Sequence, residues 1–126
     1  MKGGIIISFN VIFYETKEGK LPAEEFINSQ DSRMRDKIAR DIGILKIFGN
    51  ALRMPYSEHL QDGIFQLRTQ LGNNISRVLY FFYDGKDIIF TNGFNKKTRT
   101  TPPKEIEKAK KYRDDYFERR NNNENV

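Results

Sequence analysis

The chain has 126 residues, no cysteine and a formal net charge of +5 at pH 7. This length fits one domain that buries its own core, and the lack of cysteine excludes a disulfide framework, a thiolate nucleophile and any cysteine-ligated metal centre. Residues 86–126 hold 11 of the 22 lysines and arginines against 7 of the 17 acids, whereas residues 1–85 hold 11 against 10. A basic C-terminal third favours a polyanion as ligand. We therefore expect a single domain over residues 1–126, with a polar, frayed tail at residues 121–126.

No segment has the pattern of a signal peptide or a membrane span. The N-terminal MKGGIIISFN contains an apolar run that is too short for a signal-peptide core, and it continues into strand-like alternation. No later run reaches the roughly 18 apolar residues that a membrane span requires. We expect a soluble, cytoplasmic protein.

The first half of the chain predicts one strand and two helices. Residues 8–15, SFNVIFYE, are rich in β-branched and aromatic residues, which favours a strand. Residues 21–30 carry Pro22 at a first helical position, followed by two acids, and predict a short helix. From Ser32 to about Phe48, five apolar residues recur at helical spacing and predict a long amphipathic helix. These five are expected in the core: Met34, Ile38, Ile42, Leu45 and Phe48.

The second half predicts an antiparallel meander and a last helix. Residues 51–63 have no clean period and are expected to form an extended loop. Three strands then follow, at residues 64–71, 75–83 and 87–94. Asp84-Gly85, between the last two strands, is a strong hairpin signal. Thr101 is expected to cap the last helix, with Pro102 at its first position. The side of this helix that can pack consists of Ile106, Ala109, Tyr112 and Tyr116.

Strand alternation places two arginines on one face of the sheet. If Asn73-Asn74 forms a two-residue turn, Gln70 lies opposite Arg77, and Arg68 shares that face diagonally. A one-residue change in the turn would reverse the arrangement. The opposite face is expected to be apolar and covered by the long helix, and it consists of Leu67, Val78, Tyr80, Phe82 and Ile89.

The next turn extends this face toward the last helix. If Asp84-Gly85 forms a two-residue turn, Arg77 lies opposite Asn92, and Phe94 and Lys96 follow on the same face. Five cations are then expected on or beside one surface: Arg68, Arg77, Lys96, Lys97 and Arg99.

Two interpretations of this cationic face are open. Arginine offers a rigid fork that matches phosphate oxygens, and Phe94 offers a plane on which a base can stack, so RNA is the ligand that this chemistry fits best. The alternative is structural: the arginines pair with Glu58 or Asp62, and residues 96–99 form a solvated strand end.

Three segments resemble the RelE/ParE superfamily of toxins from type II toxin–antitoxin modules, specifically its phage-derived HigB-like branch. They are DGIFQLR at residues 62–68, ISRVLYFF at 75–82 and GFNKKTRTTPPKEIEKAKKYRDDY at 93–116. The pattern KKT-x-x-TP-x-x-E-I-x-x-A is the most specific part. The resemblance implies a RelE-like α+β fold. In that fold an antiparallel sheet of the N-terminal strand and the C-terminal three-stranded meander packs against two N-terminal helices, and a C-terminal helix follows.

The resemblance also implies a function. Toxins of this kind cleave messenger RNA in association with the translating ribosome and are neutralised by a helix-turn-helix antitoxin, here HigA-like. The ribose 2′-hydroxyl attacks the adjacent phosphate, leaving a cyclic phosphate and a free 5′-hydroxyl, and no metal or cofactor is required. Two alternatives remain open: a ParE-like toxin that inhibits DNA gyrase, and an RNA-binding module that leaves RNA intact.

The resemblance assigns expected roles to the cations. Arg77 matches the arginine of the family's Y/S-R-V/L-x-Y strand and, with Arg68, is expected to stabilise the charge of the phosphorane. Lys96 or Lys97 is expected to transfer protons if the neighbouring cations, including Arg99, shift its protonation equilibrium.

Other candidates lie outside the arginine pair. His59, the chain's one histidine, is an alternative proton carrier because its unperturbed pKa is near neutrality. Phe94, Thr98 and Arg99 are expected to bind RNA. The sequence departs from the superfamily's lysine-rich strand at Gln66, where a lysine would be expected.

Overall fold

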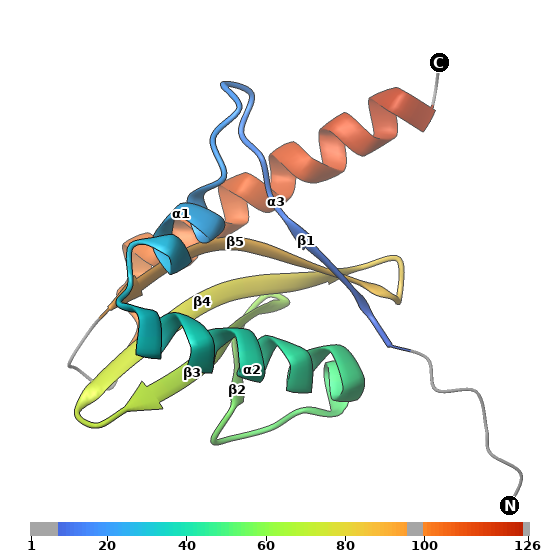
Figure 1. The fold of residues 1–126 in the computed structure, drawn as a ribbon. Helices are drawn as coiled ribbons and strands as arrows, with labels where there is room; N and C mark the ends of the chain where they lie inside the picture. Colours follow the sequence, from blue (N-terminus) through green and yellow to red (C-terminus); the bar gives the residue numbers. More distant parts are fainter. Residues whose placement is uncertain (1–7, 96–99, 125–126) are drawn as a thin grey trace, which may run out of the picture.

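A computed structural model describes residues 8–95 and 100–124. A five-stranded sheet carries α1 and α2 on one face and α3 on the other (Figure 1). The elements are β1 (Asn10–Phe13), α1 (Pro22–Asn28), α2 (Ser32–Phe48), the 3-10 helix η1 (Gly49–Ala51), β2 (Ser57–Gln61), β3 (Ile64–Leu71), β4 (Asn74–Tyr83), β5 (Asp87–Asn95) and α3 (Pro103–Glu124). The expected α+β class is confirmed, but the N-terminal strand β1 is parallel to its neighbour β5 and not antiparallel as expected. No helix within the two described ranges is long and apolar enough to cross a membrane.

The strand order is β1-β5-β4-β3-β2, with β1 parallel to β5 and the other pairs antiparallel. The loop predicted for residues 51–63 is wrong, because Ser57–Gln61 form β2 and make the meander four-stranded. β2 is a polar edge strand and carries little strand signal. Asp62 and Gly63, both at positive φ, form the two-residue turn to β3, and this Asp-Gly pair is the signal that favours a hairpin.

The long helix α2 has the predicted ends, whereas α3 differs from the prediction at both ends. α2 begins after Asp31, whose side chain accepts a hydrogen bond from the Met34 N–H at 2.9 Å, and it ends at Phe48 as predicted. Phe48 itself is 54% exposed rather than buried. α3 begins at Pro103 rather than directly after a Thr101 cap, and it continues through four residues of the tail that was expected to fray.

Gly49 ends α2 at a close approach that admits no side chain. Its φ is +53°, and a Cβ built there would lie 2.0 Å from Cε1 of Phe9. The Phe9 N–H also donates to the Lys46 carbonyl at 2.8 Å, which fixes the start of β1 against the end of α2.

Replacing Gly49 by alanine is expected to lower the free energy of unfolding by about 2–4 kcal/mol, because it combines an unfavourable positive φ with displacement of the Phe9 ring. Urea denaturation followed by circular dichroism measures the effect. Gly43→Ala is the matched control: its Cβ meets nothing within 4 Å inside the same helix, so it should stabilise by about 0.5–1 kcal/mol. Equal effects of the two substitutions would contradict this account.

The register of β3 and β4 preserves the predicted faces. Leu71 pairs with Asn74, so the turn lies one residue earlier than predicted, and Arg68 is directly opposite Arg77. Gln70 pairs with Ile75 instead of Arg77. A shift of two residues in pairing leaves every side chain on its predicted face.

Relative to the prediction, the side chains of β5 switch to the opposite face of the sheet twice. The turn before it has three residues, 84–86, so Ile89 packs on the α3 side and its predicted place under α2 is wrong. A bulge at Thr91 then restores the predicted parity. As a result Phe94 shares a face with Arg77 and lies directly opposite it.

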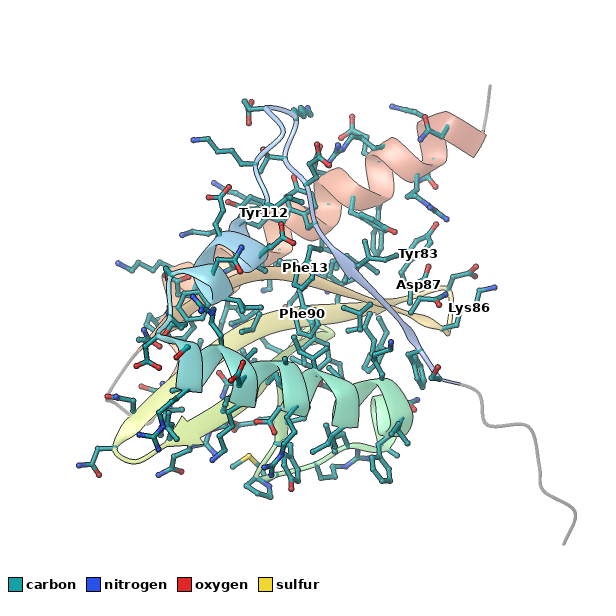
Figure 2. The ribbon with its side chains drawn as sticks, in the orientation of Figure 1. Phe13, Tyr83, Lys86, Asp87, Phe90 and Tyr112 are labelled. Atoms are coloured by element: carbon teal, nitrogen blue, oxygen red, sulfur yellow. The ribbon has the colours of Figure 1, made fainter. Side chains whose placement is uncertain are left out.

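The two sheet faces support two apolar clusters. The α3 side contains Tyr14, Ile64, Leu79, Phe81, Ile89, Ile106 and Ala109. The α1/α2 side contains Ala23, Leu45, Leu67, Val78, Tyr80, Ile88 and Phe90. On this second side Phe13 of β1 stacks on Phe90 of β5, with ring centroids 5.8 Å apart (Figure 2). The parallel β1–β5 pair is therefore joined by side chains as well as by backbone hydrogen bonds.

Candidate functional site

Arg68 and Arg77 form a cross-strand pair on the α3 face of the sheet. Arg77 is 1% exposed and Arg68 is half-buried. Burial, followed by the nearby charge of Arg68, lowers the pKa of Arg77, and the carboxylate of Glu58 partly opposes this effect. Arginine remains protonated even so. The face therefore concentrates positive potential in a partly desolvated place, where it acts more strongly on a bound anion than it would in water.

A chain of polar side chains joins β2, β3 and the start of α3 beside this pair. Gln66 is 1% exposed, donates through Nε2 to Glu58 Oε1 at 2.9 Å and accepts at Oε1 from the Thr101 hydroxyl at 2.6 Å. Asn92 Nδ2 donates to Glu105 Oε1 at 3.1 Å on the first turn of α3. Gln66 thus stands where the superfamily pattern predicted a lysine, and it positions Glu58 and Thr101.

Gln66→Leu is expected to lower the free energy of unfolding by about 1–3 kcal/mol, because buried Gln66 loses its hydrogen bonds to exposed Glu58 and half-buried Thr101 while the side-chain volume is kept. Thermal or urea unfolding measures this loss. Gln70→Leu is the control, since Gln70 lies on the same strand and is exposed, so its effect should stay within about 0.5 kcal/mol. A Gln66 variant as stable as wild type would show that the polar chain contributes nothing to stability.

Glu58 is a site residue that the sequence suggested only as a partner for the arginines. It is exposed, pairs with Gln66 across the strands and therefore shares the face of Arg68 and Arg77. The other suggested partner, Asp62, instead pairs with Lys110 at 2.7 Å, which lowers the pKa of Asp62. The prediction missed the position of Glu58 because residues 57–61 lacked a strand pattern.

His59 is not brought to the arginine pair. It pairs with Phe65 across the strands, which places its ring on the α1/α2 side of the sheet, with the ring centroids 4.9 Å apart. Its Nε2 accepts the Gly63 N–H at 3.1 Å. His59 therefore supports the turn between β2 and β3 from the face opposite Arg77.

Phe94 is half-buried opposite Arg77 and packs against the apolar cluster of the α3 side. Lys96, Lys97, Thr98 and Arg99 lie outside the described residues. The residues that flank them are tied to the site: Asn95 pairs with Ser76, next to Arg77, and Thr101 bonds to Gln66.

The chain is similar to a solved archaeal structure, the RelE–RelB complex from Pyrococcus horikoshii OT3, with a TM-score of 0.48 and 15% sequence identity over 74% of this chain and 99% of that one. No curated protein matches it. The family described as "Phage derived protein Gp49-like (DUF891)" matches residues 25–114. Because this match spans most of the 126 residues, the chain belongs to the phage-derived Gp49-like family.

Proposed function

We propose that the protein is the toxin of a type II toxin–antitoxin module of the HigB-like branch and that it cleaves messenger RNA at the ribosome. The supporting observation is the cross-strand pair of Arg68 and Arg77, one half-buried and one fully buried, on a face that also carries an exposed carboxylate at Glu58. Positive charge concentrated in this way suits the stabilisation of an anionic transition state. A cytoplasmic location and a HigA-like helix-turn-helix antitoxin belong to the same proposal.

The proposed reaction is transesterification by the RNA itself. A base removes the proton of the ribose 2′-hydroxyl, the oxygen attacks the adjacent phosphorus, and the bond to the 5′-oxygen breaks as that oxygen is protonated. The half-buried Arg68 guanidinium contacts the phosphate, and Arg77 adds positive potential from the sheet beside it. The products are a 2′,3′-cyclic phosphate and a 5′-hydroxyl.

Proton transfer is assigned to Glu58 and the lysine pair. The Glu58 carboxylate is held by Gln66 on the arginine face, and this geometry suits a base. Lys96 or Lys97, which follow β5 directly, would then protonate the leaving oxygen. Phe94, Thr98 and Arg99 are proposed to hold the adjoining nucleotides.

The test maps new RNA 5′ ends in a reconstituted translation reaction on a defined message, alongside the same message without ribosomes. The expected result is a set of new ends that carry 5′-hydroxyls and appear only with ribosomes. The same ends should form in excess EDTA when cleavage is assayed on isolated ribosome–message complexes supplemented with polyamine. RNA bound but left intact would assign the protein to the RNA-binding alternative. Inhibition of DNA supercoiling by gyrase, with intact message, would assign it to the ParE-like alternative.

A further inference from the structure

Exposed apolar side chains gather where α2 ends. Phe48 and Met54 are 54% and 55% exposed. They line a groove of about 440 Å³ together with Ile44, Ala51, Leu52, Arg53 and Tyr56. The sequence pattern predicted a core position for Phe48, so its exposure leaves an apolar surface that the described chain does not cover.

A second pocket continues this groove to Arg68, which borders it although its position in β3 faces α3, because its Nη1 donates to the Pro55 carbonyl at 3.5 Å. It has a volume of about 220 Å³ and is lined by Lys37, Arg40, Asp41, Pro55, Tyr56, Arg68 and Gln70. Tyr56 lines both pockets, so they adjoin. One stripe of α2 forms a wall of the whole groove, because the lining residues from this helix recur at helical spacing: Lys37, Arg40, Ile44 and Phe48. We call the two pockets together the α2 groove.

The charge of the α2 groove changes along its length. Its apolar end lies at Phe48, and its other end carries Lys37, Arg40 and Arg68. The one carboxylate among the lining residues, that of Asp41, is 3% exposed and accepts the Thr69 hydroxyl at Oδ2 at 2.9 Å, so it is largely covered. Within residues 8–95 and 100–124, no ion pair joins the three cations to an acid. The cationic end is thus suited to carboxylates supplied from outside.

We propose that the α2 groove binds an acidic, amphipathic segment of a partner protein. The stripe from Lys37 to Phe48 is about 17 Å long at 1.5 Å per residue, which matches about three turns of a helix lying in the groove. Apolar side chains of the segment contact Ile44, Phe48 and Met54, and carboxylates one or two turns away contact Arg40 and Arg68. At the apolar end Arg53 is the one cation among the lining residues, so this end offers little to a phosphate backbone and favours a protein segment over nucleic acid.

The shared residue Arg68 makes this binding inhibitory. A carboxylate on the Arg68 guanidinium occupies the place proposed for the scissile phosphate, so bound partner and bound RNA compete. This inhibitory half rests on the proposed function, whereas the binding half does not.

The test selects a display library of random 12-residue peptides on the purified protein. The selected peptides are expected to carry net negative charge and apolar residues at helical spacing. The peptide with the highest affinity should bind at least about tenfold more weakly to the Phe48→Ser and Arg40→Glu variants. Ile47→Ser is the matched control, because Ile47 is 58% exposed on the same helix but does not line the groove. Lys20→Glu controls for charge reversal at an exposed position away from the groove.

Three outcomes would overturn the proposal: no enrichment, enrichment without an acidic and apolar bias, or equal binding to the groove variants and the controls. An RNA 12-mer that binds with the same sensitivity to Phe48→Ser would assign the groove to RNA instead. The selected peptide is then added to the cleavage reaction, where it should slow cleavage in competition with RNA. Peptide binding by a protein that never cleaves RNA would refute the proposed function while leaving the groove assignment intact.

Discussion

Replacing Arg68 by alanine is expected to lower the rate of RNA cleavage by about 10²–10³-fold, the usual effect of removing one fixed group that stabilises transition-state charge. Arg68 is half-buried and sits across from Arg77. Burial and, after it, the charge of Arg68 lower the pKa of Arg77, so removing Arg68 also removes a like-charge repulsion. The free energy of unfolding should therefore change by less than about 1 kcal/mol.

Arg68 gives a cleaner test than Arg77. Arg77 is 1% exposed, so its replacement alters packing and catalysis together. Single-turnover cleavage of a message bound to ribosomes measures the effect of Arg68→Ala, with Lys20→Ala as the control at an exposed position. Arg68→Lys should recover only part of the rate, because it keeps the charge but loses the planar fork. Cleavage by a folded Arg68→Ala protein at the wild-type rate would remove Arg68 from the catalytic site.

The sequence predicted the arginine face correctly for a physical reason. Side-chain direction in a strand depends only on parity, so the two-residue error in the predicted pairing of β3 with β4 did not change any side chain's face. The β4–β5 turn was wrong by one residue, yet Phe94 still lies beside Arg77 because the bulge at Thr91 cancels that error. Ile89 lies before the bulge, and it was therefore assigned to the wrong face.

Apart from the Asp62-Gly63 turn, the other parts of the site carried no local sequence signal that predicts them. β2 is short and polar because one of its edges is unpaired, so neither alternation nor β-branched residues marked it. Because β2 was not predicted, Glu58 could not be assigned to a face of the sheet. For the same reason His59 could not be placed on the face opposite Arg77. The structural role of Gln66 depends on Thr101, which is 35 residues away in the chain, and no local pattern predicts a contact of that range.

Glu58→Gln tests the proposed base and is expected to lower the rate of cleavage at saturating RNA by about 10²–10⁴-fold. The amide keeps the shape of the side chain and an oxygen that can accept from Gln66 Nε2, so the fold should be retained. The substitution also removes a negative charge from the cationic face. RNA binding should accordingly be unchanged or tighter, and this separates a catalytic loss from a binding loss.

The nature of the leaving group separates a base from an acid at Glu58. An RNA whose scissile 5′-oxygen is replaced by sulfur has a leaving group that departs without protonation. This substrate should rescue variants of the residue that protonates the 5′-oxygen, but it should not rescue Glu58→Gln, because the 2′-hydroxyl still has to lose its proton. Rescue of Glu58→Gln by the sulfur substrate would make Glu58 the acid and leave Lys96 or Lys97 as the base. If Glu58→Gln cleaves the ordinary substrate at the wild-type rate, Glu58 is not the base. Its role is then to offset the charge of buried Arg77, and the substitution changes only the free energy of unfolding.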